Sequence, residues 1–151
     1  MANTQAMCTS FKAEILTGTH NFGVAPTRGS TAADSFKAAL YLASATVNAT
    51  TTAYSVTNEV SGTNYTAGGV AVTNATVPTT SGTTAYWTPS ASITYTNVTL
   101  STAFDAVLIY NSTQSNKAVS VHTFGSQTVT AGTFSLTMPA NAPRTALLNI
   151  A

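Results

Sequence analysis

Hydrophobic and polar residues alternate with a period of two along much of this chain, which is typical of β-strands. The alternation is clearest over residues 133–138 and recurs over residues 93–100 and 118–124. Residues 105–110 are almost continuously apolar, which favours a strand buried on both faces. The second half of the chain is therefore predicted to form a β-sheet core.

The first half of the chain gives a similar but weaker pattern. Phe11, Ala13 and Ile15 fall on alternate positions, so residues 11–16 are predicted to form a strand, and residues 18–33 a loop. Asp34 could cap a helix over residues 34–45, because Phe36 and later apolar residues also recur at helical spacing. The Thr-rich run that follows favours extended chain, so this segment is predicted to be a strand.

Turn-forming residues separate the predicted strands. Residues 111–116 are polar and lie between two strong strand patterns, which predicts a hairpin loop. Residues 125–132 predict a second hairpin with a short strand at 127–130, so residues 105–138 would form an antiparallel meander that Pro139 ends. Further Gly and Pro residues mark turns at Gly62, Gly68, Gly69, Pro78, Gly82 and Pro89.

The chain length and the short strands set the expected fold class. A chain of 151 residues that is 44% hydrophobic can bury a core of its own. No composition shift or internal repeat divides it, so residues 1–151 are predicted to form a single β-rich domain. Short strands with frequent turns favour an all-β fold, a single-domain antiparallel β-sandwich of jelly-roll-like or related type with few or no helices.

The composition is unusual because only 6% of the residues are charged, against about a quarter in an ordinary soluble domain. The chain instead contains 31 Thr, 15 Ser and 11 Asn residues, which predicts a neutral hydroxyl- and amide-rich surface. Nucleic acids and anionic membranes attract clustered cations, so neither is expected as a partner. The five cations are scattered along the chain: Lys12, Arg28, Lys37, Lys117 and Arg144.

No segment has the features of a membrane span or of an export signal. No apolar stretch reaches the length of a transmembrane helix. Residues 1–10 lack the charged and apolar regions of a secretory signal.

The few ionisable residues offer little catalytic chemistry. Glu14, Asp34, Glu59 and Asp105 are the only acids that could act as a pair on a sugar, and we expect them to be solvated or capping carboxylates instead. No nucleophile motif or phosphate-binding glycine loop is present. The sequence therefore predicts no catalytic residues and a protein that is not an enzyme.

The remaining ionisable side chains are predicted to have no catalytic or metal-binding role. His20 and His122 are expected to be surface or interface histidines, and Cys8 a small, partly buried side chain without a disulfide partner. No cluster has the spacing of metal ligands, so neither a metal nor a cofactor is expected.

Three aromatic residues, Tyr86, Trp87 and Tyr95, are the candidate interface or ligand-binding positions. Tyr and Trp anchor many protein interfaces, their rings can stack on the apolar face of a sugar, and they are also common in protein cores. The sequence leaves these three interpretations open.

Several stretches together carry a family resemblance. They are residues 11–16 and 34–41 (FKAEIL and DSFKAALY), residues 58–69 (NEVSGTNYTAGG), and residues 104–111, 117–125 and 132–139 (FDAVLIYN, KAVSVHTFG and GTFSLTMP). In this order they resemble a family of small virion structural proteins of tailed bacteriophages, and the small neutral chain is similar to capsid cement or decoration proteins.

The resemblance implies a non-enzymatic protein of the phage particle. It implies binding to the major capsid protein on the outer shell, self-association as a homotrimer, and assembly in the host cytoplasm. A neck or tail structural protein and a receptor- or carbohydrate-binding module of a tail or head fibre are the alternatives. A glycan-cleaving tail protein would need a catalytic pair among Glu14, Glu59 and Asp105.

Overall fold

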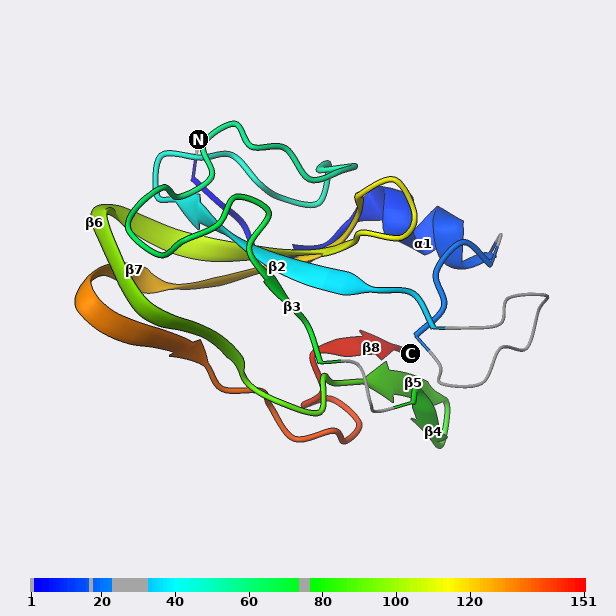
Figure 1. Ribbon diagram of the computed structural model, residues 1–151. Helices are drawn as coiled ribbons and strands as arrows, with labels where there is room; N and C mark the ends of the chain where they lie inside the picture. Colours follow the sequence, from blue (N-terminus) through cyan, green and yellow to red (C-terminus); the bar gives the residue numbers. More distant parts are fainter. Residues whose placement is uncertain (1, 17, 23–32, 74–76) are drawn as a thin grey trace.

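The chain folds into two antiparallel β-sheets and one short helix (Figure 1). The computed structural model describes residues 2–16, 18–22, 33–73 and 77–151. The predicted all-β class with few helices is confirmed, and the sandwich type stays a prediction. The elements in chain order are β1 (Ala6–Met7), α1 (Thr9–Leu16), β2 (Phe36–Leu42), β3 (Val70–Ala71), β4 (Thr79–Ser81), β5 (Thr84–Trp87), β6 (Ile93–Asn111), β7 (Lys117–Leu136) and β8 (Leu148–Ile150).

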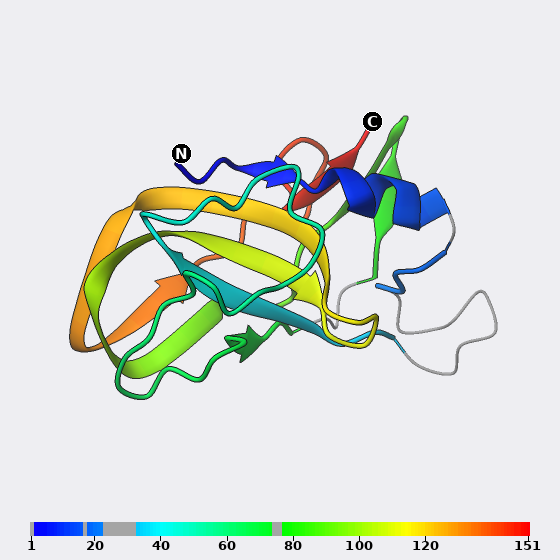
Figure 2. The same cartoon turned by 90° about the horizontal axis from the view of Figure 1, so that it is seen from above.

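The larger sheet has the strand order β1-β7-β6-β2-β3 and is built on the long β6–β7 hairpin. Figures 1 and 2 show both hairpin strands curving strongly, so that the start of β6 and the end of β7 form a second layer below β2. The Tyr95 hydroxyl in this layer donates a hydrogen bond to the Ala38 carbonyl of β2 at 2.8 Å. The core lies between these two layers.

Irregular pairing explains the curvature of the hairpin. The β6–β7 register shifts at several points, and Asn97 and Ala131 near two of them have φ values of 54° and 45°. Such bulges bend a strand and change which side chains face inward. The simple alternation predicted over residues 93–100 therefore breaks at this point, because Asn97 is exposed while Val98 is buried.

The structure corrects the predicted meander after residue 105. The loop over residues 112–116 does join two strands, as predicted. The predicted second hairpin at residues 125–132 is wrong, because this segment is the middle of the continuous strand β7. Gly125 and Gly132 lie within the bent part of the ladder, where a residue without a side chain is tolerated.

Strand β2 confirms the choice of strand over helix for residues 34–45. Alternate residues Phe36, Ala38 and Leu40 are buried, and so are Ala39 and Tyr41. Both faces of β2 are therefore covered. This double burial is why its apolar residues satisfied the helical pattern as well as the alternating one.

The predicted strand over residues 11–16 is wrong, since these residues belong to helix α1. Phe11 is buried and Ile15 is partly buried one helical turn later, while Ala13 is exposed. Gly18, with a φ of 68°, ends the helix. Its N–H bonds to the Ile15 carbonyl, and the Thr19 N–H bonds to the Glu14 carbonyl, the pattern of a Schellman cap.

Two further features position the candidate sites. The smaller sheet has the order β4-β5-β8. The chain between β2 and β3, called here the excursion (residues 43–69), contains only isolated β-bridges.

Cys8 is fully buried, and burial, with a smaller effect of Glu14, raises its pKa to about 11.

Some sequence-based predictions concern residues outside the described part of the chain. The prediction that no segment spans a membrane can be examined within that part. Residues 23–32 of the predicted loop, and Arg28 among the cations, lie outside the described residues. Within the described part of the chain, no helix is long and apolar enough to cross a membrane.

Candidate functional site

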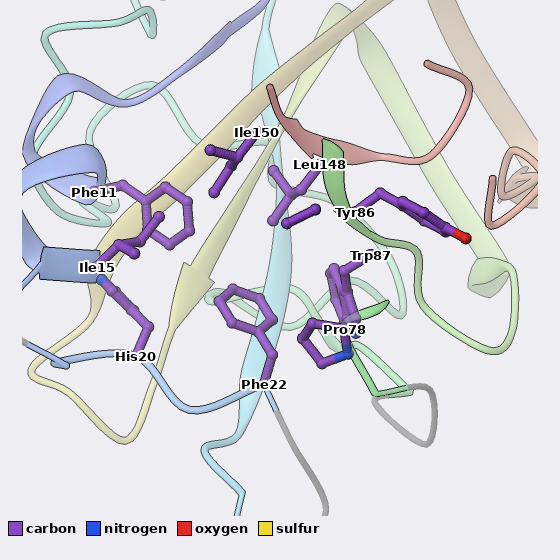
Figure 3. A pocket seen from close by; sticks show the side chains of 10 residues that line it. Phe11, Ile15, His20, Phe22, Pro78, Tyr86, Trp87, Leu148 and Ile150 are labelled. Atoms are coloured by element: carbon purple, nitrogen blue, oxygen red, sulfur yellow. The ribbon is translucent and has the colours of Figure 1, made fainter. Parts of the chain in front are cut away.

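An apolar cleft lies between helix α1 and the inner face of the smaller sheet (Figure 3). Its volume is about 170 Å³, and nearly all of its lining atoms are apolar. Segments far apart in the sequence meet there. The lining residues are Phe11, Ile15, His20, Phe22, Pro78, Ala85, Tyr86, Trp87, Leu148 and Ile150.

Local geometry explains how these segments form the two walls of the cleft. One wall is helical, with Phe11 and Ile15 one turn apart on α1. The other wall is a sheet in which Trp87 pairs with Leu148, and Ala85 pairs with Ile150 two residues along each strand. Residues two apart on a strand share a face, so their side chains line the cleft together.

Phe22 lies against the aromatic end of the cleft. Its ring stacks on Phe36 with a centroid distance of 4.3 Å and an interplanar angle of 18°. It meets Trp87 edge-on at 4.8 Å and Phe11 edge-on at 6.0 Å. These offset-stacked and T-shaped contacts are the favoured arrangements of aromatic rings, so this end is well packed.

The structure brings two of the three predicted aromatic site residues together. Trp87 lines the cleft but is only 2% exposed, so its ring offers no open platform for a sugar. Tyr86 is partly exposed, and Figure 3 shows its hydroxyl group pointing away from the cleft. Tyr95 is a core residue elsewhere, buried and stacked on Tyr65 at 5.9 Å.

The cleft can accept a small apolar group. A dry apolar cavity of about 150 Å³ is large enough to bind benzene or xenon. His20 in the lining makes hydrogen bonds to other residues, and the Tyr86 hydroxyl points away from the cleft. The site therefore offers mainly a dispersion and hydrophobic contact surface.

His20 is held in one tautomer by its neighbours. The Asn111 Oδ1 atom accepts hydrogen bonds from the backbone N–H groups of Thr113 and Gln114, both at 3.1 Å. Its Nδ2 group must therefore face His20 Nδ1 at 3.1 Å, and it also donates to Asp34 at 2.7 Å. His20 Nδ1 is thus the acceptor, and the ring proton lies on Nε2.

Glu14 completes this network. The His20 Nε2–H donates to its Oε2 atom at 2.7 Å, and Lys117 donates to its Oε1 atom. Burial alone would raise the pKa of Glu14, but the hydrogen bonds from Lys117 and His20 and the charge of Lys117 lower it below 4.5. The predicted surface position of His20 is wrong, because its side chain is fully buried, where it joins α1 to the β6–β7 turn.

Glu59 is a buried residue within the excursion. Its carboxylate accepts hydrogen bonds from the Tyr54 and Tyr65 hydroxyls, both at 2.7 Å, and from the Gly68 N–H at 2.8 Å. Burial first, and then the hydrogen bond to Glu59, raises the pKa of both tyrosines, so they remain donors. Glu59 therefore ties parts of the excursion to one another, and the Tyr65 hydroxyl, which accepts from the Leu40 N–H, connects this cluster to β2.

The four acids each accept hydrogen bonds within the fold. Asp105 accepts a hydrogen bond from the Asn3 amide. Glu14 and Asp34 are linked through His20 and Asn111. Asp34 and Glu59 are each only 7% exposed, so they are not solvated, but each accepts a backbone N–H, from Asn21 and Gly68 respectively, as a capping carboxylate does.

His122 lies apart from these networks, in a small apolar pocket near Ile109, Phe124 and Met138. Its Nε2 atom is 2.9 Å from the Ser120 hydroxyl. Burial lowers its pKa to about 4, so the ring is neutral at physiological pH.

In the described part of the chain, no three His, Cys, Asp or Glu residues are grouped in a way that could hold a metal ion.

Comparisons with protein-family models, curated proteins and solved structures found no match to this chain.

Sequence reasoning missed several residues that line the cleft together with Trp87. Phe11 and Ile15 were assigned to a strand, and Leu148 and Ile150 near the C-terminus were not singled out. Two signals were present: the four-residue spacing of Phe11 and Ile15 ahead of Gly18, and the alternation of Leu148 and Ile150.

Proposed function

We propose that this chain is a non-enzymatic structural protein of a tailed-phage virion, of the capsid cement or decoration type. In this proposal it binds the outer shell, bridges major capsid subunits and associates as a homotrimer. The sequence resemblance motivates the proposal, and the chemistry of the described side chains supports it.

The observation that carries the proposal is the engagement of the ionisable side chains inside the fold. Asp34 and Asp105 accept hydrogen bonds from distant segments, as Glu14 does from Lys117, while Glu59 accepts hydrogen bonds within the excursion. Catalytic carboxylates need access to a substrate, whereas these hold loops and the helix in place. The exposed surface is left mainly with hydroxyl, amide and small apolar groups, which suits binding.

A neutral surface of this kind fits repeated attachment to a symmetric shell. Hydroxyl and amide groups can form hydrogen bonds without the cost of desolvating a charge. Each contact is then weak, but simultaneous contacts by linked copies multiply their effect. The low net charge of +1 also adds little repulsion between neighbouring copies.

Binding to purified shells tests the proposal. Purified protein is added to expanded shells of the parent phage that lack it, with heat-denatured protein as the control. We expect co-sedimentation with the shells and a higher temperature of shell disruption. Failure to bind, or binding without any gain in thermal stability, would overturn the cement assignment.

A further inference from the structure

The excursion (residues 43–69) carries a second, polar groove that the cement function does not require. A loop much longer than about 15 residues is uncommon in a small domain and usually has a function of its own. This one has a defined shape. Glu59 holds its middle, and backbone hydrogen bonds join Tyr54 to Asn116 and Val60 to Leu40.

The groove has a volume of about 240 Å³ and lies where the excursion folds back on the end of β2. Its buried residues, Tyr41, Ala45 and Val47, are mostly apolar. Its rim is exposed and polar. The rim residues with hydroxyl or amide groups are Thr46, Thr51, Ser55, Thr57 and Asn58.

Some of these groups support the loop, and others are available to a ligand. The Thr51 hydroxyl accepts a hydrogen bond from the Asn48 N–H, and the Ser55 hydroxyl accepts one from the Thr57 N–H. The Thr57 hydroxyl and the Asn58 amide make no hydrogen bond within the described residues. Asn58 is held in the left-handed region at a φ of 60°, next to the buried Glu59.

We propose that this groove binds a neutral carbohydrate, one sugar ring at a time. A sugar ring has apolar C–H faces and a rim of hydroxyl groups, which matches a lining that combines hydroxyl and amide groups with the exposed methyl group of Ala53. The residues that line the groove carry no charge, so binding leaves no charge unpaired. A small number of polar groups beside apolar ones is common in small-ligand sites.

Binding of a single sugar is expected to be weak. The Tyr41 ring is only 2% exposed, so it cannot provide a full stacking surface. Affinity then depends on hydrogen bonds, each of which contributes modestly in water, and the dissociation constant falls in the millimolar range. This inference does not depend on the proposed virion function, because it concerns a different kind of ligand.

The test is an NMR titration of the intact protein with methyl α-glucopyranoside, methyl α-galactopyranoside and N-acetylglucosamine, with glycerol as a small polyol control. At least one sugar should produce saturable shift changes confined to residues 41–58. Two variants remove the available rim groups: Thr57→Val, and Asn58→Gly, which keeps the left-handed backbone. Each should weaken binding about threefold to tenfold.

Matched variants separate binding from effects on folding. Thr133→Val on the exposed face of β7, and Asn116→Gly at a left-handed turn position, make the same changes elsewhere and should leave binding unchanged. No saturable shifts with any of the three sugars would overturn the inference. Shifts at the apolar cleft instead, or equal affinity in all four variants, would also overturn it.

Discussion

At the scale of single residues, hydrogen bonds stabilise the polar side chains that are buried. Glu59 is buried with two tyrosine hydroxyls and one backbone N–H as its donors. A buried carboxylate is costly unless its oxygens accept hydrogen bonds, and charge-assisted bonds are stronger than neutral ones. The Tyr65 hydroxyl does more than donate, because it also accepts from the Leu40 N–H at 2.9 Å.

Replacing these tyrosines should have unequal effects on stability. Tyr65→Phe removes one of the donors to Glu59 and also leaves the buried Leu40 N–H without its hydroxyl acceptor, so we expect a loss of about 2–4 kcal/mol in the free energy of unfolding. Tyr54→Phe removes one hydrogen bond at a less buried position and should cost about 1 kcal/mol. Urea unfolding measures both values. A larger loss for Tyr54→Phe than for Tyr65→Phe would contradict this account of the cluster.

The pKa of His122 predicts a pH dependence of stability. The unfolded chain binds a proton near pH 6.5, whereas burial keeps the folded pKa at about 4. The depressed folded pKa contributes stability that is fully present above pH 6.5 and is lost as the pH falls towards 4. We expect a lower free energy of unfolding at pH 5 than at pH 7.

His122→Gln isolates this effect because the variant side chain does not titrate. The decrease between pH 7 and pH 5 should be reduced in the variant relative to the wild type. The pKa of Glu14 is also lowered, but the stability that Glu14 contributes is lost only below pH 4.5, outside this window. An unchanged decrease in the variant would show that His122 is not the titrating group.

At the scale of elements, periodicity predicted the strands whose faces are regular and missed the elements whose pattern is short or interrupted. Residues 105–110 and 133–138 were recognised because burial follows a simple rule in each. The alternation over residues 11–16 is too short to distinguish a strand from the helix that Gly18 ends. The bend in β7 could not be predicted, because Gly125 and Gly132 signal turns and bulges alike.

The junction between the excursion and β3 depends on a glycine. Gly69 has a φ of 69°, and a Cβ atom there would lie 1.7 Å from the Ala38 carbonyl oxygen. Gly69→Ala should therefore cost about 3 kcal/mol or more, because it combines backbone strain with overpacking against the β2 main chain. Gly125→Ala is the matched control, since its Cβ would meet nothing within 4 Å. Equal thermal stability of the two variants would contradict the described junction.

The apolar cleft is a property of two elements, α1 and the smaller sheet, and it should bind a small apolar probe. Benzene is expected to raise the midpoint of thermal unfolding, because a ligand that binds only the folded state stabilises it. Ala85→Leu should fill the cleft and remove this response, whereas Ala140→Leu at an exposed position should retain it. If both variants responded to benzene equally, the cleft would not be the binding site.

At the scale of the whole molecule, the sequence predicted the surface chemistry better than the sites. The low charge and the abundant Thr, Ser and Asn residues were enough to predict a neutral surface. Tyr86 and Trp87 were identified, but their partners Phe11 and Ile150 lie at opposite ends of the chain. Local patterns carry no information about which distant segments meet, so the cleft and the groove on the excursion required the three-dimensional structure.

The number of copies per particle is the most direct test of the proposed function. A cement protein occupies symmetric sites over the whole shell, whereas a neck or tail ring uses a small cyclic set. The measurement is the molar ratio of this chain to the major capsid protein in purified virions of the parent phage, by quantitative mass spectrometry. We predict hundreds of copies per virion. About six or twelve copies, or only a few trimers, would contradict the cement assignment.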